Sequence, residues 1–172
     1  MKAIVLTCWE ICLLRRGPQL FPRSGVLLGM MLTVYALLDI YGGFLQGMYD
    51  WLSLLGSTLV DVAMLSLFCY LVMVFWRRRA RFNQVLTAML GTSSLLTCAG
   101  LPLISILHFD HLPLSLQQLI QLMLLTLLMW NIVVMAHILR YALDNAAFAP
   151  ILLAAPYQLL NFLVLTKLFP GN

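Results

Sequence analysis

The sequence contains few charged residues for its length. Asp, Glu, Lys and Arg account for 9% of the 172 residues, whereas 63% of the residues are hydrophobic. Soluble domains carry about 25% charged residues, so this composition excludes an ordinary soluble protein. The mean hydropathy of +0.98 indicates an integral membrane protein. No stretch is long or polar enough to form a separate soluble domain.

Signatures of catalysis and of metal binding are also missing. The sequence has no HExxH motif, no phosphate-binding glycine loop, no Ser/His/Asp arrangement and no acidic metal cluster. We therefore predict a protein that is not an enzyme and that carries neither cofactor nor metal. The loop with His108, Asp110 and His111 offers a zinc-like set of side chains, but it matches no strong motif. We interpret that loop as a polar turn.

Four cysteines occur, and all are predicted to be reduced. Cys8 and Cys12 are four residues apart and would share a helix face on the cytoplasmic side, where thiols are kept reduced. Cys69 and Cys98 fall inside apolar runs, where a thiol behaves as a small packing residue.

The basic residues that are present are concentrated in one short segment. Four arginines occupy five positions between two long apolar runs: Arg77, Arg78, Arg79 and Arg81. An arginine at the centre of a bilayer costs between about 3 and 15 kcal/mol, so the cluster must lie outside the hydrocarbon. We interpret it as a topology anchor, because short basic loops stay cytoplasmic. The alternative is a site for anionic lipid headgroups. Nucleic-acid binding is excluded because so few residues cannot form a binding surface.

The apolar runs predict an all-α, polytopic membrane helix bundle. Residues 1–24 are expected to form a short interfacial helix and a basic connector, because the run before Arg15 is too short to cross a hydrocarbon core of about 30 Å. Residues 25–172 form the transmembrane domain. Its five spans are predicted at Gly25–Met48, Leu52–Trp76, Val85–Leu107, Leu116–Leu139 and Ala147–Leu168.

The distribution of positive charge predicts how these spans cross the bilayer. With a cytoplasmic amino terminus and a periplasmic carboxyl terminus, only Lys167 of the ten Lys and Arg residues lies outside. This asymmetry is the one that the positive-inside rule requires. We predict a bacterial inner-membrane protein, because the chain has no long loops or cytosolic domains.

Small residues form a stripe along the first span. At about 100° per residue, the small residues of the stripe and Asp39 fall on one helix face. The pairs Gly25/Gly29 and Gly43/Gly47 have GxxxG spacing, which allows helix backbones to approach closely. A similar face on the fifth span carries Ala154, Gln158 and Asn161. The predicted helix-packing residues are Gly25, Gly29, Ala36, Gly43, Gly47 and Ala154.

Asp39 and Asp61 are the acidic residues inside predicted spans. Each lies nine residues from the outer end of its span, so the two are expected at similar depth on neighbouring antiparallel helices. Paired carboxylates in a low dielectric could share a proton or hold a cation. The alternative is that each carboxyl is simply hydrogen-bonded within the bundle.

The fourth span carries polar residues on two faces, which predicts a position in the middle of the bundle. One face holds Gln117, Gln121 and Asn131. Near its cytoplasmic end, Trp130, Asn131, His137 and Arg140 could line an inner-leaflet cavity. We interpret His137 and Arg140 instead as groups that cap carbonyls or meet headgroups.

The layout resembles the Yip1-domain family, whose members are described as five-span membrane proteins with a cytoplasmic amino terminus. The segment Asp39-Ile40-Tyr41-Gly42-Gly43 is similar to the DLYGP-type motif of the eukaryotic members. It differs in having Gly43 in place of the proline and in lying within the first span instead of before it. No functional residue is carried over from the family. The resemblance implies an interaction or scaffolding protein of the membrane.

Together these patterns predict a non-enzymatic membrane protein that acts as a scaffold, assembly or accessory subunit. Its partners would be the lipid bilayer and either a second copy of the chain or another integral membrane protein, joined through helix–helix contacts. The alternative is a small transporter or channel component that handles protons or cations through Asp39 and Asp61.

Overall fold

A computed structural model describes residues 2–47, 50–107, 113–144 and 149–169 of the chain. Within these ranges the chain forms six α-helices, two short 3-10 turns and no strand. Five of the helices are long and apolar enough to cross a membrane. The prediction of an all-α membrane helix bundle is therefore confirmed. The helices are α1 (Lys2–Cys12), α2 (Gly25–Leu45), α3 (Trp51–Phe75), α4 (Phe82–Leu107), α5 (Leu114–Leu143) and α6 (Ala149–Leu168).

Polar side chains define where two of the long helices begin. The Ser24 hydroxyl accepts a hydrogen bond from the Leu27 backbone N–H at the start of α2. The Asp50 carboxylate accepts from the Leu52 and Ser53 backbone N–H groups at the start of α3. Such caps satisfy backbone donors that have no partner inside the helix, so both helices start within one residue of their predicted positions.

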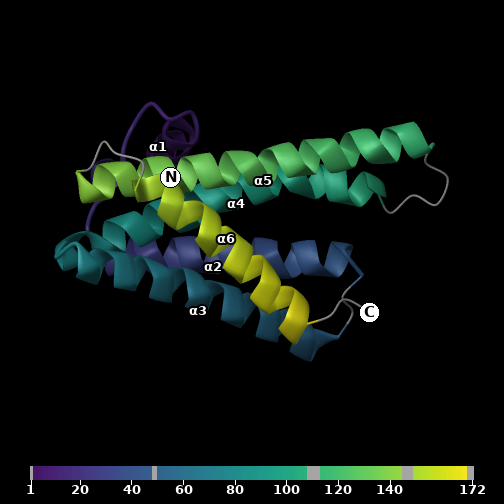
Figure 1. Ribbon diagram of the computed structural model, residues 1–172, viewed down its shortest axis with the longest axis horizontal. Helices are drawn as coiled ribbons and strands as arrows, with labels where there is room; N and C mark the ends of the chain where they lie inside the picture. Colours follow the sequence, from purple (N-terminus) through teal and green to yellow (C-terminus); the bar gives the residue numbers. More distant parts are fainter. Residues whose placement is uncertain (1, 48–49, 108–112, 145–148, 170–172) are drawn as a thin grey trace.

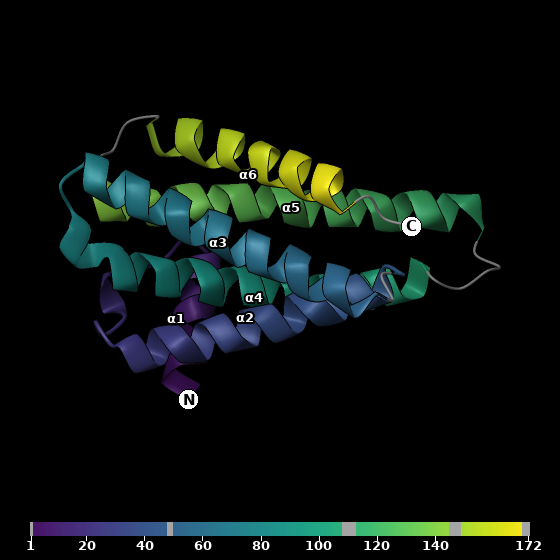
Figure 2. The same ribbon diagram turned by 90° about the horizontal axis from the view of Figure 1, so that it is seen from below.

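The central helix of the bundle is α4, and the prediction that the fourth span is central is wrong. α4 contacts α1, α2, α3 and α5, and Figure 2 shows it between α2 and α5. Residues 85–94 of α4 are all buried, whereas Gln121 and Thr126 of α5 are exposed. The segment tolerates burial because its hydroxyls bond to its own backbone; Thr92 and Ser94 donate to carbonyls one turn earlier.

The five long helices pack in a ring, and α3 also contacts α4 across it. α2 contacts α3, α3 contacts α6, α6 contacts α5, α5 contacts α4, and α4 contacts α2. Figure 1 shows α6 crossing α3 obliquely on one side of this ring. A ring of five helices encloses more interior space than a pair or a triplet, and the polar residues discussed below line that space.

The amino-terminal helix α1 runs across the long axis of the bundle (Figure 2). One face is buried, with Cys8 and Ile11 packed in the core. The opposite face leaves Leu6 and Trp9 exposed. Gly91 of α4 permits this close packing, because a Cβ added there would lie 2.7 Å from the Cys8 sulfur. The short amino-terminal helix is thus present, with one face on the bundle and an apolar face open to surrounding lipid.

The basic segments gather at one end of the bundle. The Gln84 side chain at the start of α4 donates to the Phe21 carbonyl of the connector, at 2.6 Å. The imidazole of His137, near the end of α5, lies 3.1 Å from the Arg16 carbonyl. The α3–α4 connection, the end of α5 and the start of α6 lie at this same end, and α6 runs away from it (Figure 1). The compartment that this end faces stays a prediction.

The glycine stripe of the first span differs from the prediction in two respects. α2 ends at Leu45, and Gly47 lies beyond it with a φ of +88°, so Gly43 and Gly47 do not form a GxxxG pair on one helix face. Gly25 and Gly29 are exposed, and an added Cβ would meet no heavy atom of this chain within 4 Å. These two glycines therefore do not mediate packing within the described part of the chain.

The other predicted packing residues lie closer to the interior. Ala36 and Gly43 are half-buried, and Ala154 on α6 is fully buried in the core. The close helix approaches depend on glycines that the stripe did not include. Besides Gly91, Gly56 of α3 lies so close to the Phe169 ring that an added Cβ would be 2.9 Å from it.

Candidate functional site

Two carboxylates bind hydrogen-bond donors across the antiparallel pair α2–α3. The Thr58 hydroxyl of α3 donates to Asp39 of α2, at 2.6 Å. One turn away, the Tyr35 hydroxyl of α2 donates to Asp61 of α3, at 2.5 Å. The two bonds are successive steps along one helix interface. Asp39 and Asp61, predicted at similar depth, therefore lie about one helical turn apart along the helix axes.

Asp61 also joins a third helix to this pair. The side-chain amide of Asn161 on α6 donates to the second oxygen of Asp61, at 2.5 Å. Asp61 is only 6% exposed, and burying a carboxylate is costly unless donors surround it. Tyr35 and Asn161 supply one donor to each oxygen, so α2, α3 and α6 converge on a single acidic group.

Both carboxylates line one cavity among the five long helices, which is open on one side because Leu159 and Phe162 of its wall are 61% and 63% exposed. Its volume is about 660 Å³, and all five long helices contribute to its wall. The apolar part of the wall includes Leu65, Ile132 and Met135. The polar lining residues are Tyr35, Asp39, Gln46, Asp61, Ser93, Thr97, Asn131, Tyr157, Gln158 and Asn161.

One polar atom in this wall has no partner. Asn161 is 7% exposed, and its side-chain oxygen makes no hydrogen bond to the described residues. Leaving a buried acceptor unsatisfied costs about 1–3 kcal/mol. Because the same amide is oriented by its bond to Asp61, the oxygen is fixed in the wall as an acceptor that has no donor among the described residues.

The cavity lies between the middle of the bundle and the end away from the arginines. Asp61 is ten residues after Trp51, the first residue of α3, which places it about 15 Å along that helix. Gln46, the residue that caps the end of α2, is exposed and also lines the cavity. The polar wall therefore continues from the buried Asp61 and the half-buried Asp39 to a residue at the bundle end.

The four residues that could have lined an inner-leaflet cavity at the fourth span lie in different surroundings. Asn131 lines the cavity described above and lies 3.5 Å from the Ser93 hydroxyl. The Trp130 indole instead donates to the Cys12 carbonyl, at 3.0 Å, and His137 contacts the connector. Arg140 is exposed. Trp130 and His137 hold the amino-terminal segment against α5, so only Asn131 of the predicted group belongs to the site.

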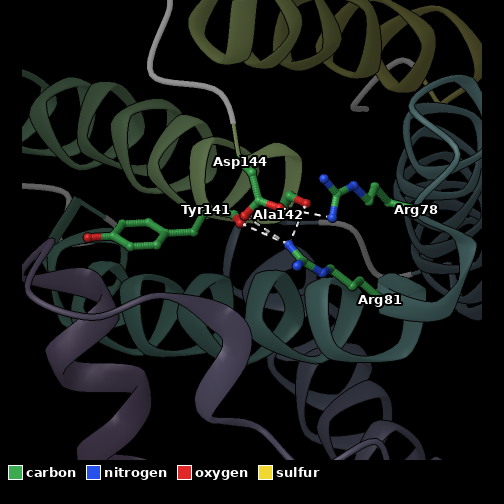
Figure 3. A network of polar contacts seen from close by, with 5 residues as sticks. All are labelled: Arg78, Arg81, Tyr141, Ala142 and Asp144. Carbon is green, nitrogen blue, oxygen red and sulfur yellow. Dashed lines mark hydrogen bonds and ion pairs between the residues drawn. The ribbon is translucent and has the colours of Figure 1, made fainter.

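The arginine cluster divides into paired and exposed side chains. Arg81 and Arg78 form ion pairs with Asp144 at 3.1 and 2.9 Å (Figure 3). Arg81 also donates to the Tyr141 and Ala142 carbonyls at the end of α5.

This pairing changes both the carboxylate and the predicted lipid site. The hydrogen bond and charge of Arg81 lower the pKa of Asp144 below its ordinary value. Arg77 and Arg79 are exposed, and their side chains have no hydrogen-bond or ion-pair partner among the described residues. Of the four predicted headgroup ligands, Arg77 and Arg79 therefore remain open to an anion.

The described residues contain no group of three or more His, Cys, Asp or Glu that could hold a metal ion. The predicted alternative at His108, Asp110 and His111 lies outside the described residues. Burial raises the pKa of the Cys8 and Cys12 thiols to about 11. At neutral pH both are therefore protonated, which makes them poor nucleophiles and poor metal ligands.

Comparisons with protein-family models, with curated proteins and with solved structures found no match to this chain. The resemblance to the Yip1-domain family stays a prediction. The function is therefore inferred from the cavity and from the chemistry of the residues that line it.

Proposed function

We propose that this protein binds a monovalent cation in the cavity and acts as a small transporter or channel component. The observation that carries the proposal is that Asp39 and Asp61, from neighbouring helices, line one cavity within the membrane-spanning bundle. A pair of acids in that position attracts positive charge, because an unneutralised carboxylate in a low-dielectric interior is costly.

The other polar lining residues support the same reading. An ion that leaves water must exchange its hydration shell for protein oxygens. The cavity supplies hydroxyl and amide oxygens from Ser93, Thr97 and Asn131 beside the two carboxylates. Purely structural polar contacts between helices would need no open volume, whereas a partly open space of about 660 Å³ lies beside these groups.

Flux through reconstituted protein tests the proposal. Purified protein in liposomes should carry protons, sodium or an organic ammonium ion faster than protein-free liposomes do. Replacing both carboxylates, Asp39→Asn with Asp61→Asn, should lower that flux at least about tenfold, because the amides keep the shape but lose the charge.

Asp50→Asn is the matched control, since Asp50 caps α3 at the bundle end and is exposed. Its flux should equal that of the wild type. Unchanged flux in the double variant, or no flux from the wild type for any of the three ions, contradicts the proposal.

A second function is favoured by the exposed stripe on α2. Gly25 and Gly29 have open space above them, and this spacing is the one that lets another membrane helix pack closely. We propose that a second copy of the chain or another integral membrane protein packs there, as a scaffold or accessory contact. Mass measurement of the protein in a gentle detergent should show a complex that Gly29→Leu breaks. A monomer of the wild type would argue against it.

We further propose a bacterial inner-membrane location with a cytoplasmic amino terminus and a periplasmic carboxyl terminus. The gathering of the connector and of the arginine-rich connection at one end of the bundle supports this orientation. The exposed Arg77 and Arg79 would then meet anionic headgroups of the inner leaflet.

A further inference from the structure

We infer that the cation is an organic ammonium ion with an N–H group and an apolar body. This inference rests on the proposed function and names the class of its ligand. It follows from the size of the cavity, from the unpaired oxygen of Asn161 and from the mixed wall around the carboxylates.

The volume of the cavity suits an organic ligand. Cavities that bind small organic molecules measure about 300–1,000 Å³, and this one measures about 660 Å³. A bare metal ion needs far less space and is usually enclosed by ligand oxygens at about 2–2.6 Å. The apolar side chains of Leu65, Ile132 and Met135 share the wall with the acids, and apolar groups offer nothing to a metal ion. They do offer burial to a hydrocarbon chain.

The unpaired side-chain oxygen of Asn161 suits a ligand that has an N–H group. The Asn161 amide group donates to Asp61, and its oxygen is a buried acceptor with no donor in the part of the chain that the structure describes. An ammonium N–H satisfies that oxygen while its charge is balanced by Asp61. A quaternary ammonium ion carries the same charge but has no N–H to donate, so it would leave the oxygen unsatisfied.

The aromatic residues of the cavity wall suit an organic cation. Tyr35, Tyr157 and Phe162 line the cavity, and the Tyr157 ring is fixed by stacking on Phe68 with centroids 4.2 Å apart. Aromatic faces attract organic cations and also accept hydrocarbon. Aromatic faces attract ammonium ions with and without N–H groups alike. The preference for an ion that has an N–H group therefore depends on the Asn161 oxygen.

Binding of matched probes to the purified wild type tests the inference by calorimetry. The probes are hexylammonium, hexyltrimethylammonium, neutral hexanol and sodium. We expect hexylammonium to bind at least about tenfold more tightly than hexyltrimethylammonium, and hexanol and sodium to bind more weakly than both.

A variant then locates the discrimination. Asn161→Leu removes the acceptor and should bring the affinities of the two ammonium ions to within about twofold of each other, since the difference rests on a single hydrogen bond. Gln121→Leu makes the same chemical change at an exposed position of α5 and should keep the tenfold preference. The wild-type series stands by itself if the Asn161 variant does not fold.

The outcomes separate this inference from the proposed function. Equal binding of the two ammonium ions, or preservation of the preference in folded Asn161→Leu, overturns the inference. If sodium binds tightly and is transported but hexylammonium is not, the inference is wrong and the proposed function still stands. If no probe binds and the carboxylate variants do not alter flux, both are wrong.

Discussion

At the scale of single residues, Asp61 has the greatest influence on the interior. Its two oxygens accept hydrogen bonds from Tyr35 and Asn161, and it is almost fully buried. A buried carboxylate that loses a donor keeps its desolvation cost and loses part of the compensation. The proposed binding of a cation and the stability of the bundle would therefore depend on the same acidic group.

Tyr35→Phe should lower the free energy of unfolding by about 1–2 kcal/mol, because it removes one donor to Asp61 without changing the ring. Reversible unfolding in mixed micelles measures the difference. Tyr41→Phe is the matched control, since Tyr41 lies on the same helix, is 51% exposed and makes no described hydrogen bond through its hydroxyl. Equal effects of the two substitutions would show that the Tyr35 hydroxyl does not stabilise the bundle.

The residues of the site were partly predictable from the sequence. Helical periodicity placed Asp39 on a face expected to meet protein, and placed Asn161 on the same face of α6 as Ala154. Both expectations match the positions of these residues in the interior. The partners Tyr35 and Thr58 could not be identified, because aromatic and hydroxyl side chains inside spans are common and only contact between α2 and α3 selects these two.

At the scale of elements, the two connections at the basic end are joined by charge. Asp144 follows α5 in a left-handed conformation with a φ of +51°, and both Arg78 and Arg81 reach it from the α3–α4 connection. The ion pairs are exposed, so they orient the connections more than they stabilise the fold. α5 was predicted at the centre of the bundle because its polar residues occupy two faces. Instead, Gln121 and Thr126 are exposed, Asn131 lines the cavity and His137 contacts the connector.

This link should be sensitive to acid. Because Arg81 and Arg78 lower the pKa of Asp144 below its ordinary value of 3.8, the carboxylate is paired at neutral pH. The stabilising contribution is present above that ordinary value and is lost as the pH falls through the lower value of the folded protein. Spin labels on the two connections should report greater separation only in strong acid.

Asp144→Asn provides the comparison for this acid response. It should show the greater separation already at neutral pH and respond less to acid, because the amide cannot be protonated there. A separation that responds to acid equally in both proteins would assign the response to another group.

At the scale of the whole molecule, charge is segregated along the bundle axis. The connector and the arginine-rich connection lie at one end. The end of α6, which carries Lys167, packs near the start of α3 at the opposite end, where Phe169 meets Gly56. The cavity extends toward the end that has few basic residues. A cation would therefore enter from the side where positive charge does not repel it.

Single cysteines in a cysteine-free background should reveal this orientation in whole cells. A membrane-impermeant maleimide applied from outside should label Ser115→Cys, near the start of α5, but not Arg79→Cys, because the proposed orientation places the arginine-rich end in the cytoplasm. Both positions are exposed, so lysed cells should label both and serve as the control. Labelling of Arg79→Cys in intact cells would reverse the orientation.

The sequence alone determined the number of spans and the separation of charge, because hydrocarbon excludes arginine and requires about twenty apolar residues for each crossing. Those constraints act on each segment locally. The tertiary structure decided that α4 is central, that Asn161 meets Asp61 a hundred positions earlier, and that Asp144 captures two of the arginines. These outcomes depend on which helix faces pack together, and small residues such as Gly91 control that packing through contacts with distant segments of the chain.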